Sequence, residues 1–144
     1  MGELNYEQLL NENDIAIAQL KIVHQLPEVS RYISISDNYF YYVTNTYDVY
    51  FYKIYNDDKL IGSIHLEKQG DVLFMEILVF PEFQGNGVGK KIVRDIQNDV
   101  LKLGYKKIEI SIDETNSVSL KLFKSTGFTR TSKDGELINF VYQR

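Results

Sequence analysis

Three glycines alternate in a short segment that joins an apolar stretch to an amphipathic one. The segment FPEFQGNGVGKKIVRDI covers residues 80–96 and contains Gly85, Gly87 and Gly89. Glycine loses more conformational freedom on folding than other residues, so such a cluster indicates a positive φ or a close approach to another group. The first N–H groups of a helix have no intrahelical partner and, with the helix dipole, attract anions. Because glycines carry no Cβ to block these groups, the segment predicts a cradle for a pyrophosphate.

Two well-known phosphate-loop patterns do not fit this spacing. The dinucleotide-binding pattern needs G-x-G-x-x-G, and the P-loop needs a longer glycine spacing followed by Ser or Thr, where this chain has Lys91. A third pattern, Q/R-x-x-G-x-G/A between a strand and a helix, fits Gln84 to Gly89. The adjacent Lys90 and Lys91 add positive charge. The alternative interpretation is a strand-to-helix turn that only needs a positive φ.

The surrounding pattern predicts the elements that position this loop. Strands are expected at 3–10, 49–55, 59–67, 71–80, 106–113 and in a last hairpin of 128–133 and 136–143 around an Asp134-Gly135 turn. Helices are expected at 12–25, from Pro27 to about Ile33, after a cap at Asp37, at 87–103 with Gly104 at its C-terminal end, and from a cap at Asn116 to Ser125. Apolar faces are expected at Ile15, Ile17, Ala18, Ile22 and Val23 of the first helix, at Val88, Ile92, Val93, Ile96, Val100 and Leu103 of the helix 87–103, and at Ile108, Ile110 and Ile112 of the strand 106–113. Asp95 is expected on the opposite, polar side of the helix 87–103. The prediction is an α/β (α+β) fold, in which helices flank a mostly antiparallel sheet of about six or seven strands with a central strand–helix–strand unit.

Composition narrows the class of protein. The chain has 144 residues, of which 44% are hydrophobic, and it shows no linker or repeat, so one domain over 1–144 is expected. Twenty acidic and 16 basic residues give a net charge of −4, which disfavours nucleic acid as a partner. No apolar run reaches the roughly 18 residues of a membrane span, and the N-terminus does not resemble a signal peptide. A cytoplasmic protein without membrane association is therefore expected.

A second motif extends the pattern of the first. The segment NSVSLKLFKSTGF covers residues 116–128. With the glycine segment it resembles the GNAT superfamily of N-acetyltransferases, whose pattern here is N-x-x-A-x-x-L-Y-E-K-x-G-F. The positions that agree are Asn116, Leu122, Gly127 and Phe128, while Ser119 replaces Ala and Lys124 stands where the pattern has Glu. The resemblance covers most of the chain, firmly from about residue 48 to 128, and it implies a GNAT-like fold for the whole domain.

The resemblance implies that acetyl-CoA is the co-substrate. Its pyrophosphate would be held by Gln84, Gly85, Asn86, Gly87, Val88, Gly89 and Lys90. The backbone of the preceding strand, at Ile77, Leu78 and Val79, would pair with the pantetheine arm, and the N–H of Leu78 or Val79 would stabilise the oxyanion. The resemblance also assigns Asn116, Phe123 and Lys124 to the cofactor-binding residues.

One position departs from the family pattern. Relatives often carry Tyr where this chain has Phe123, placed to protonate the leaving thiolate, and phenylalanine has no proton to give. Three alternatives are open: another side chain gives the proton, a water molecule gives it, or CoA leaves as a thiolate. The last is tolerable at neutral pH because thiols have a pKa of about 8.5. Tyr105 and Tyr142 are the substitute donors that the sequence offers.

Attack by an amine also needs a base, because alkyl ammonium groups are protonated near neutral pH. Glu76 interrupts the apolar strand VLFMEILVF, on the face of Phe74 and Leu78 if the strand alternates. There a carboxylate would be partly desolvated and its pKa raised, which makes Glu76 the leading candidate. A solvent-facing Glu76, or one paired with lysine, is the alternative; His65 and Glu67 on the neighbouring strand are the other candidate bases.

The remaining polar and aromatic residues carry weaker signals. His24 is expected at the surface or its boundary, and two separate histidines without cysteines predict no metal site. The resemblance puts some tyrosines of 39–47 near the acceptor, where an ammonium could contact a ring, although core packing explains them equally.

The leading function is transfer of an acetyl group from acetyl-CoA to a primary amine by direct attack in a ternary complex. A non-catalytic acyl-CoA-binding regulator is the alternative that Phe123 favours, and a nucleotide-binding module is disfavoured by the failed glycine patterns. The edge of the last hairpin could pair in a homodimer.

Overall fold

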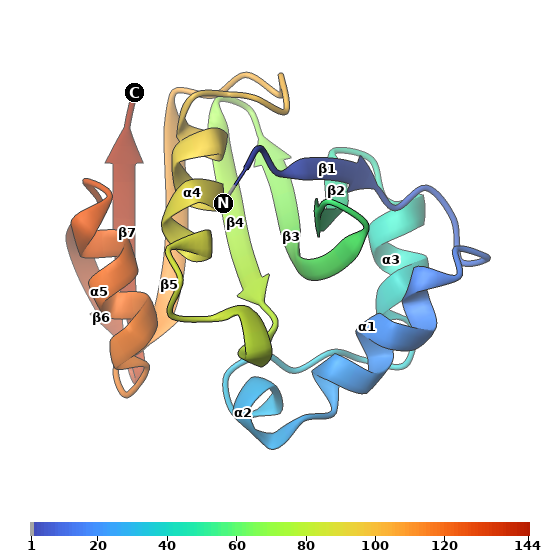
Figure 1. Cartoon of the computed structure of the whole chain (residues 1–144). Coiled ribbons are helices and arrows are strands. Elements are labelled where there is room, and N and C mark those ends of the chain that lie inside the picture. Colours follow the sequence, from blue (N-terminus) through green and yellow to red (C-terminus); the bar gives the residue numbers. More distant parts are fainter. Residues whose placement is uncertain (1) are drawn as a thin grey trace. The chain divides into compact units, whose positions relative to one another are not determined.

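The computed structural model describes residues 2–144, and Figure 1 shows the path of the chain. The helices are α1 (Ala16–His24), α2 (Pro27–Ser30), α3 (Tyr39–Asn45), the 3-10 helix η1 (Pro81–Phe83), α4 (Val88–Gln97) and α5 (Ser117–Ser125). The strands are β1 (Asn5–Gln8), β2 (Val49–Asn56), β3 (Lys59–Gln69), β4 (Val72–Val79), β5 (Lys107–Asp113), β6 (Thr129–Asp134) and β7 (Leu137–Gln143). Each predicted strand and helix is present, with shifts at the ends.

The strands form one seven-stranded sheet in the order β1-β2-β3-β4-β5-β7-β6. β4 and β5 are parallel, with Val72 opposite Lys107 and Phe74 opposite Glu109, and α4 connects them along the chain. β5 pairs antiparallel with β7, and β6 pairs antiparallel with β7. The predicted α+β fold with a central strand–helix–strand unit is therefore confirmed.

Contacts divide the chain into two compact units. The first unit contains Met1–His65 and Ile77–Gln84, and the second contains Leu66–Glu76 and Gly85–Arg144. The core of the first unit buries the rings of Phe40, Phe51 and Phe80 beside aliphatic residues of α1 and α3. In the second unit the predicted apolar face of β5 is buried at Ile108, Ile110 and Ile112.

The buried side of α1 differs from the predicted one. Ile15 and Ile22 were expected on the apolar side, but their exposed fractions are 94% and 63%. The helix instead buries Ala16, Ile17, Leu20, Val23 and His24. These positions follow the 3.6-residue period from Leu20, which carries His24 into the core one turn later. The expectation of a surface or boundary position for His24 was wrong.

The end of α4 also differs from the prediction. The helix was expected to reach residue 103, but it ends at Gln97. Asp99 follows with φ of 53°, its N–H bonds the Ile96 carbonyl at 2.9 Å, and the Val100 N–H bonds the Asp95 carbonyl at 3.1 Å. This is a Schellman ending with aspartate where glycine is usual, so Gly104 does not end the helix. Val100, expected on the buried face, is therefore exposed.

Helix caps and the sheet edge complete the fold. Asn116 caps α5, because its Oδ1 accepts from the Ser119 N–H at 3.3 Å, as predicted. Asn38 rather than Asp37 is the N-cap residue of α3. β6 ends the strand order and its residues are exposed, and pairing of this edge in a homodimer stays a prediction. Among the described residues, no helix has the length and apolar character needed to cross a membrane.

Candidate active site

The glycine loop leads directly into α4 in the second unit. Gly85 and Gly87 have φ of 85° and 79°, and Gly87 is the N-cap residue. No side chain caps the helix, and its first backbone bond runs from the Lys91 N–H to the Gly87 carbonyl at 3.1 Å. The N–H groups of Val88, Gly89 and Lys90 precede that bond, so they have no intrahelical acceptor.

Open space surrounds the loop. A Cβ atom on Gly85 or Gly87 would meet no heavy atom within 4 Å, apart from its chain neighbours in the described part of the chain. The positive φ values explain two of the three glycines. Gly89 lies in the first turn of α4, a conformation open to any residue, so φ does not explain it. Open space at Gly85 and Gly87, next to N–H groups without an intrahelical acceptor, is the arrangement that an anion cradle needs.

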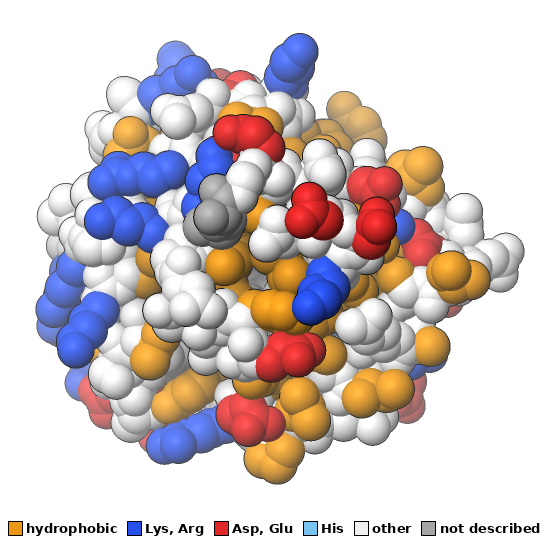
Figure 2. Space-filling view, viewed as in Figure 1, with side chains coloured by type: hydrophobic (Ala, Val, Ile, Leu, Met, Phe, Trp, Pro, Cys, Tyr) orange, Lys and Arg blue, Asp and Glu red, His pale blue; other side chains and the backbone are white. Residues whose placement is uncertain are grey.

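Basic side chains accompany this helix. Figure 2 shows Lys and Arg gathered on the side of the molecule where α5 and β6 lie. Lys90 and Lys124 are exposed, whereas the Lys91 Nζ bonds the Asp95 carboxylate at 2.8 Å. Asp95, predicted on the solvent side of the helix, is buried beneath this pair. The charge beside the loop therefore comes from Lys90 rather than equally from both lysines.

The residues before the loop belong to the first unit. The Gln84 Nε2 donates to the Val79 carbonyl at 2.9 Å and so braces the turn between β4 and the loop. The Phe80 N–H donates to the Ile61 carbonyl at 2.9 Å and extends the pairing with β3. A Cβ on Gly62 would lie 2.4 Å from the Leu78 carbonyl oxygen, so only glycine permits this approach. The sequence signal for this approach is an isolated glycine inside a strand.

Strand β4 does not alternate through its whole length. Leu73 and Met75 are buried, and then Leu78 and Phe80 are, so the alternation shifts by one residue around Glu76. Such a shift is the pattern that a β-bulge produces. Glu76 is exposed, and the expectation of a desolvated carboxylate at this position was wrong.

In the first unit, the side chain of His65 contacts a tyrosine of α3. The Tyr39 Oη lies 2.8 Å from Nδ1 of His65, which fixes the orientation of the ring from α3. The Tyr39 ring also packs edge-on against Phe40 and Phe51. Tyr41, Tyr42 and Tyr47 are exposed. The tyrosines of 39–47 are thus divided between the core and the surface.

Phe123, at the position where relatives often carry Tyr, belongs to the packed interior. Phe123 is buried and its ring lies 5.1 Å from that of Phe128 in an edge-to-face contact. Tyr142 also packs against this pair, with its ring 5.5 Å from that of Phe128. Tyr105 donates its hydroxyl to the Gln97 carbonyl at 2.5 Å and is buried. Of the two substitute donors, Tyr105 has its proton committed to the fold.

Each unit contains some of the candidate site residues. The second unit holds Glu76, the loop from Gly85 to Lys90, and α5 with Asn116, Phe123 and Lys124. The first unit holds Ile77, Leu78, Val79 and Gln84, together with His65. The arrangement offers backbone donors for a phosphate group, an accessible carboxylate, and an oriented imidazole.

Comparison with known proteins identifies the class. The sequence profile of the acetyltransferase (GNAT) family matches residues 18–128. The chain belongs to this family, and the resemblance of its two motifs is confirmed. The comparison with curated proteins found no matching relative.

Solved structures share the fold at low sequence identity. A domain from Methanocaldococcus jannaschii has a TM-score of 0.83 and 19% identity, covering 99% of each chain. Campylobacter jejuni N-acetyltransferase PseH in complex with acetyl coenzyme A has a TM-score of 0.80 and 12% identity, again over 99% of each chain. The aminoglycoside acetyltransferase AAC(6')-Ib with coenzyme A and kanamycin has a TM-score of 0.80 and 16% identity, covering 99% of this chain and 95% of that one.

Proposed function

We propose that residues 1–144 form one acetyltransferase domain that moves an acetyl group from acetyl-CoA to a primary amine. The observation that carries the proposal is the loop of Gly85 and Gly87, with positive φ and open space at the start of α4. Family membership supports acetyl transfer as the reaction class. The residues proposed to hold acetyl-CoA are Ile77, Leu78, Val79, Gln84, Gly85, Asn86, Gly87, Val88, Gly89, Lys90, Asn116, Phe123 and Lys124.

In the proposed reaction the amine nitrogen attacks the thioester carbon, a C–N bond forms and the C–S bond breaks. The backbone N–H of Leu78 would stabilise the negative charge that develops on the carbonyl oxygen. Glu76 would accept the proton that the amine loses, directly or through a water molecule. The exposure of Glu76 supports access to such a water. CoA would leave as a thiolate and take its proton from solvent, because Phe123 has no hydroxyl and the Tyr105 hydroxyl is bonded to the Gln97 carbonyl. Tyr142 is the remaining candidate donor among the side chains.

Binding and turnover test the proposal together. Calorimetric titration should show binding of CoA but not of ATP or NAD, and a thiol-release assay with acetyl-CoA should respond to added primary amines. Absence of CoA binding would overturn the proposal. CoA binding without thiol release for any amine would favour the non-catalytic acyl-CoA-binding regulator.

The role of Glu76 has its own test. Glu76→Gln should lower kcat about a hundredfold, within the usual range for loss of a general base, and change acetyl-CoA affinity less than about twofold. Glu136→Gln, at an exposed carboxylate of the same unit, is the matched control and should keep wild-type kcat. Wild-type kcat in Glu76→Gln would transfer the role to His65 or Glu67.

A further inference from the structure

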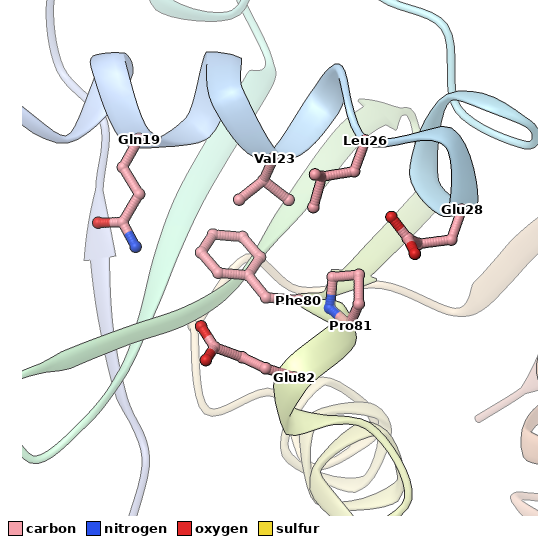
Figure 3. A pocket seen from close by; sticks show the side chains of 7 residues that line it. All are labelled: Gln19, Val23, Leu26, Glu28, Phe80, Pro81 and Glu82. Carbon is pink, nitrogen blue, oxygen red and sulfur yellow. The ribbon is translucent and has the colours of Figure 1, made fainter.

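A pocket of about 240 Å³ lies within the first unit, between α1, α2 and the segment that follows β4. Figure 3 shows its apolar lining, with Val23 and Leu26 facing Phe80 and Pro81. Its volume is below the roughly 300–1,000 Å³ typical of pockets for drug-sized ligands. The pocket therefore suits a small molecule with an aliphatic part.

Two carboxylates stand at this apolar lining. Glu28 extends from α2 and Glu82 from η1, and Figure 3 shows them near opposite faces of the Phe80–Pro81 segment. Both are exposed, and the remaining polar side chain of the lining is the amide of Gln19. Among the described lining residues there is no lysine or arginine. An apolar surface with two carboxylates matches an alkyl chain with an ammonium group.

The net charge of the whole first unit also favours a positively charged ligand. The first unit has four Lys and Arg against ten Asp and Glu, a net charge of −6, whereas the second has twelve against ten, a net charge of +2. Figure 2 shows acidic and apolar side chains side by side over α2 and η1. A surface of one sign raises the local concentration of oppositely charged substrates. The first unit thus attracts cations, while the second suits the phosphates of CoA.

The pocket is also close along the chain to the residues proposed for catalysis. Phe80 follows Leu78 by two residues, which in an extended strand is about 7 Å. Glu82 is followed within three residues by Gly85, where the proposed phosphate loop begins. The distance from the pocket lining to the backbone of Leu78 is therefore comparable to the length of a few methylene groups.

We propose that this pocket binds the acceptor and that the acceptor is a short aliphatic diamine. The inference rests on the proposed acetyl transfer. The carboxylates of Glu28 and Glu82 attract the ammonium that does not react, and the methylene groups lie on Val23, Leu26 and Phe80. The second amine attacks the thioester. The product is a monoacetylated diamine, with CoA released and one proton transferred to the base.

Substrate preference is the first test and uses the unmodified chain. We expect kcat/KM for 1,4-diaminobutane to exceed that for butylamine about tenfold or more, because butylamine lacks the second ammonium. 4-Aminobutanoate, which carries a carboxylate in its place, should be a poorer substrate than butylamine, since like charges repel. Kanamycin should be poor because its rings exceed the pocket.

Two charge-neutral variants test the pocket itself. Glu28→Gln and Glu82→Gln should each raise KM for 1,4-diaminobutane about threefold to fivefold, as expected for exposed ion pairs, with little change in kcat. Neither should change KM for butylamine or the affinity for CoA. Glu12→Gln, at an exposed carboxylate of the same unit outside the pocket, is the control and should match wild type.

The outcomes of these tests separate the diamine site from the proposed acetyl transfer. Equal kcat/KM for butylamine and 1,4-diaminobutane, or unchanged KM in both pocket variants, would overturn the diamine site and leave acetyl transfer standing. Preference for kanamycin or for 4-aminobutanoate would do the same. Failure of every amine to release thiol would overturn the proposed function and the diamine site together.

Discussion

The hydroxyl of Tyr105 donates a hydrogen bond of 2.5 Å to the backbone carbonyl of Gln97, at the last residue of α4. The Gln97 side chain in turn donates to the Thr126 carbonyl at 2.7 Å, just after α5. Burial raises the pKa of Tyr105 to about 12, with a further contribution from Tyr142. Tyr105 therefore links the segment between α4 and β5 to the ends of α4 and α5, and its hydroxyl proton is committed to the Gln97 carbonyl.

The first prediction concerns this hydroxyl. Tyr105→Phe should leave kcat within about twofold of wild type, because the proton is not available to the leaving thiolate. It should lower the free energy of unfolding by about 1–3 kcal/mol, since the buried Gln97 carbonyl loses its donor. Thiol-release kinetics and urea unfolding measure the two effects. Tyr142→Phe is the companion variant, because Tyr142 is the other candidate proton donor. A tenfold fall of kcat in Tyr105→Phe would contradict the structural role of Tyr105.

The second prediction concerns acid stability. His24 is buried against Tyr39 and Phe40, and Nδ1 and Nε2 of its ring have no hydrogen-bond partner among the described residues. Burial lowers its pKa. Below about pH 6.5 the imidazole binds a proton in the unfolded chain more readily than in the folded one. The contribution of His24 to the free energy of unfolding is therefore fully present above that pH and is lost as the pH decreases. The loss from this group is at most about 1.4 kcal/mol per pH unit.

Urea unfolding at pH 7.5 and 5.5 measures this dependence. His24→Phe keeps a ring against Phe40 and removes the titrating group, so its loss of stability between the two pH values should be smaller than that of wild type. An equal loss in both proteins would show that other groups cause the pH dependence.

The third prediction concerns the phosphate loop. Gly87→Glu should weaken CoA binding at least a hundredfold, because a carboxylate would occupy the open space at the start of α4 and repel the pyrophosphate. The positive φ makes the substitution cost about 1–2 kcal/mol of stability as well.

Gly135→Glu controls for that strain. Gly135 has φ of 60°, lies in the turn between β6 and β7, and also has open space around its Cβ position. The two variants should lose similar stability in thermal unfolding, but only Gly87→Glu should lose CoA affinity in calorimetric titration. Unchanged CoA affinity in Gly87→Glu would remove the loop from the binding site.

Local patterns in the sequence were enough to predict much of this protein. Alternating apolar residues indicated β5 and its buried isoleucines, Asn116 indicated the start of α5, and the glycine spacing indicated the loop before α4. Each of these depends on neighbours within a few residues: side-chain period, capping geometry and backbone dihedral angles. The two family motifs then indicated the class, which the family comparison confirmed.

Tertiary contacts decided the rest. α4 ended at Gln97 because Asp99 adopts a left-handed conformation, although the apolar pattern continued beyond it. His24 entered the core, Glu76 stayed at the surface, and the Tyr105 hydroxyl was committed to Gln97. The pocket joins α1 and α2 to Phe80 and Glu82, which lie more than 50 residues further along the chain. The sequence alone predicts the elements because their causes are local, whereas burial and cavities depend on which distant elements meet.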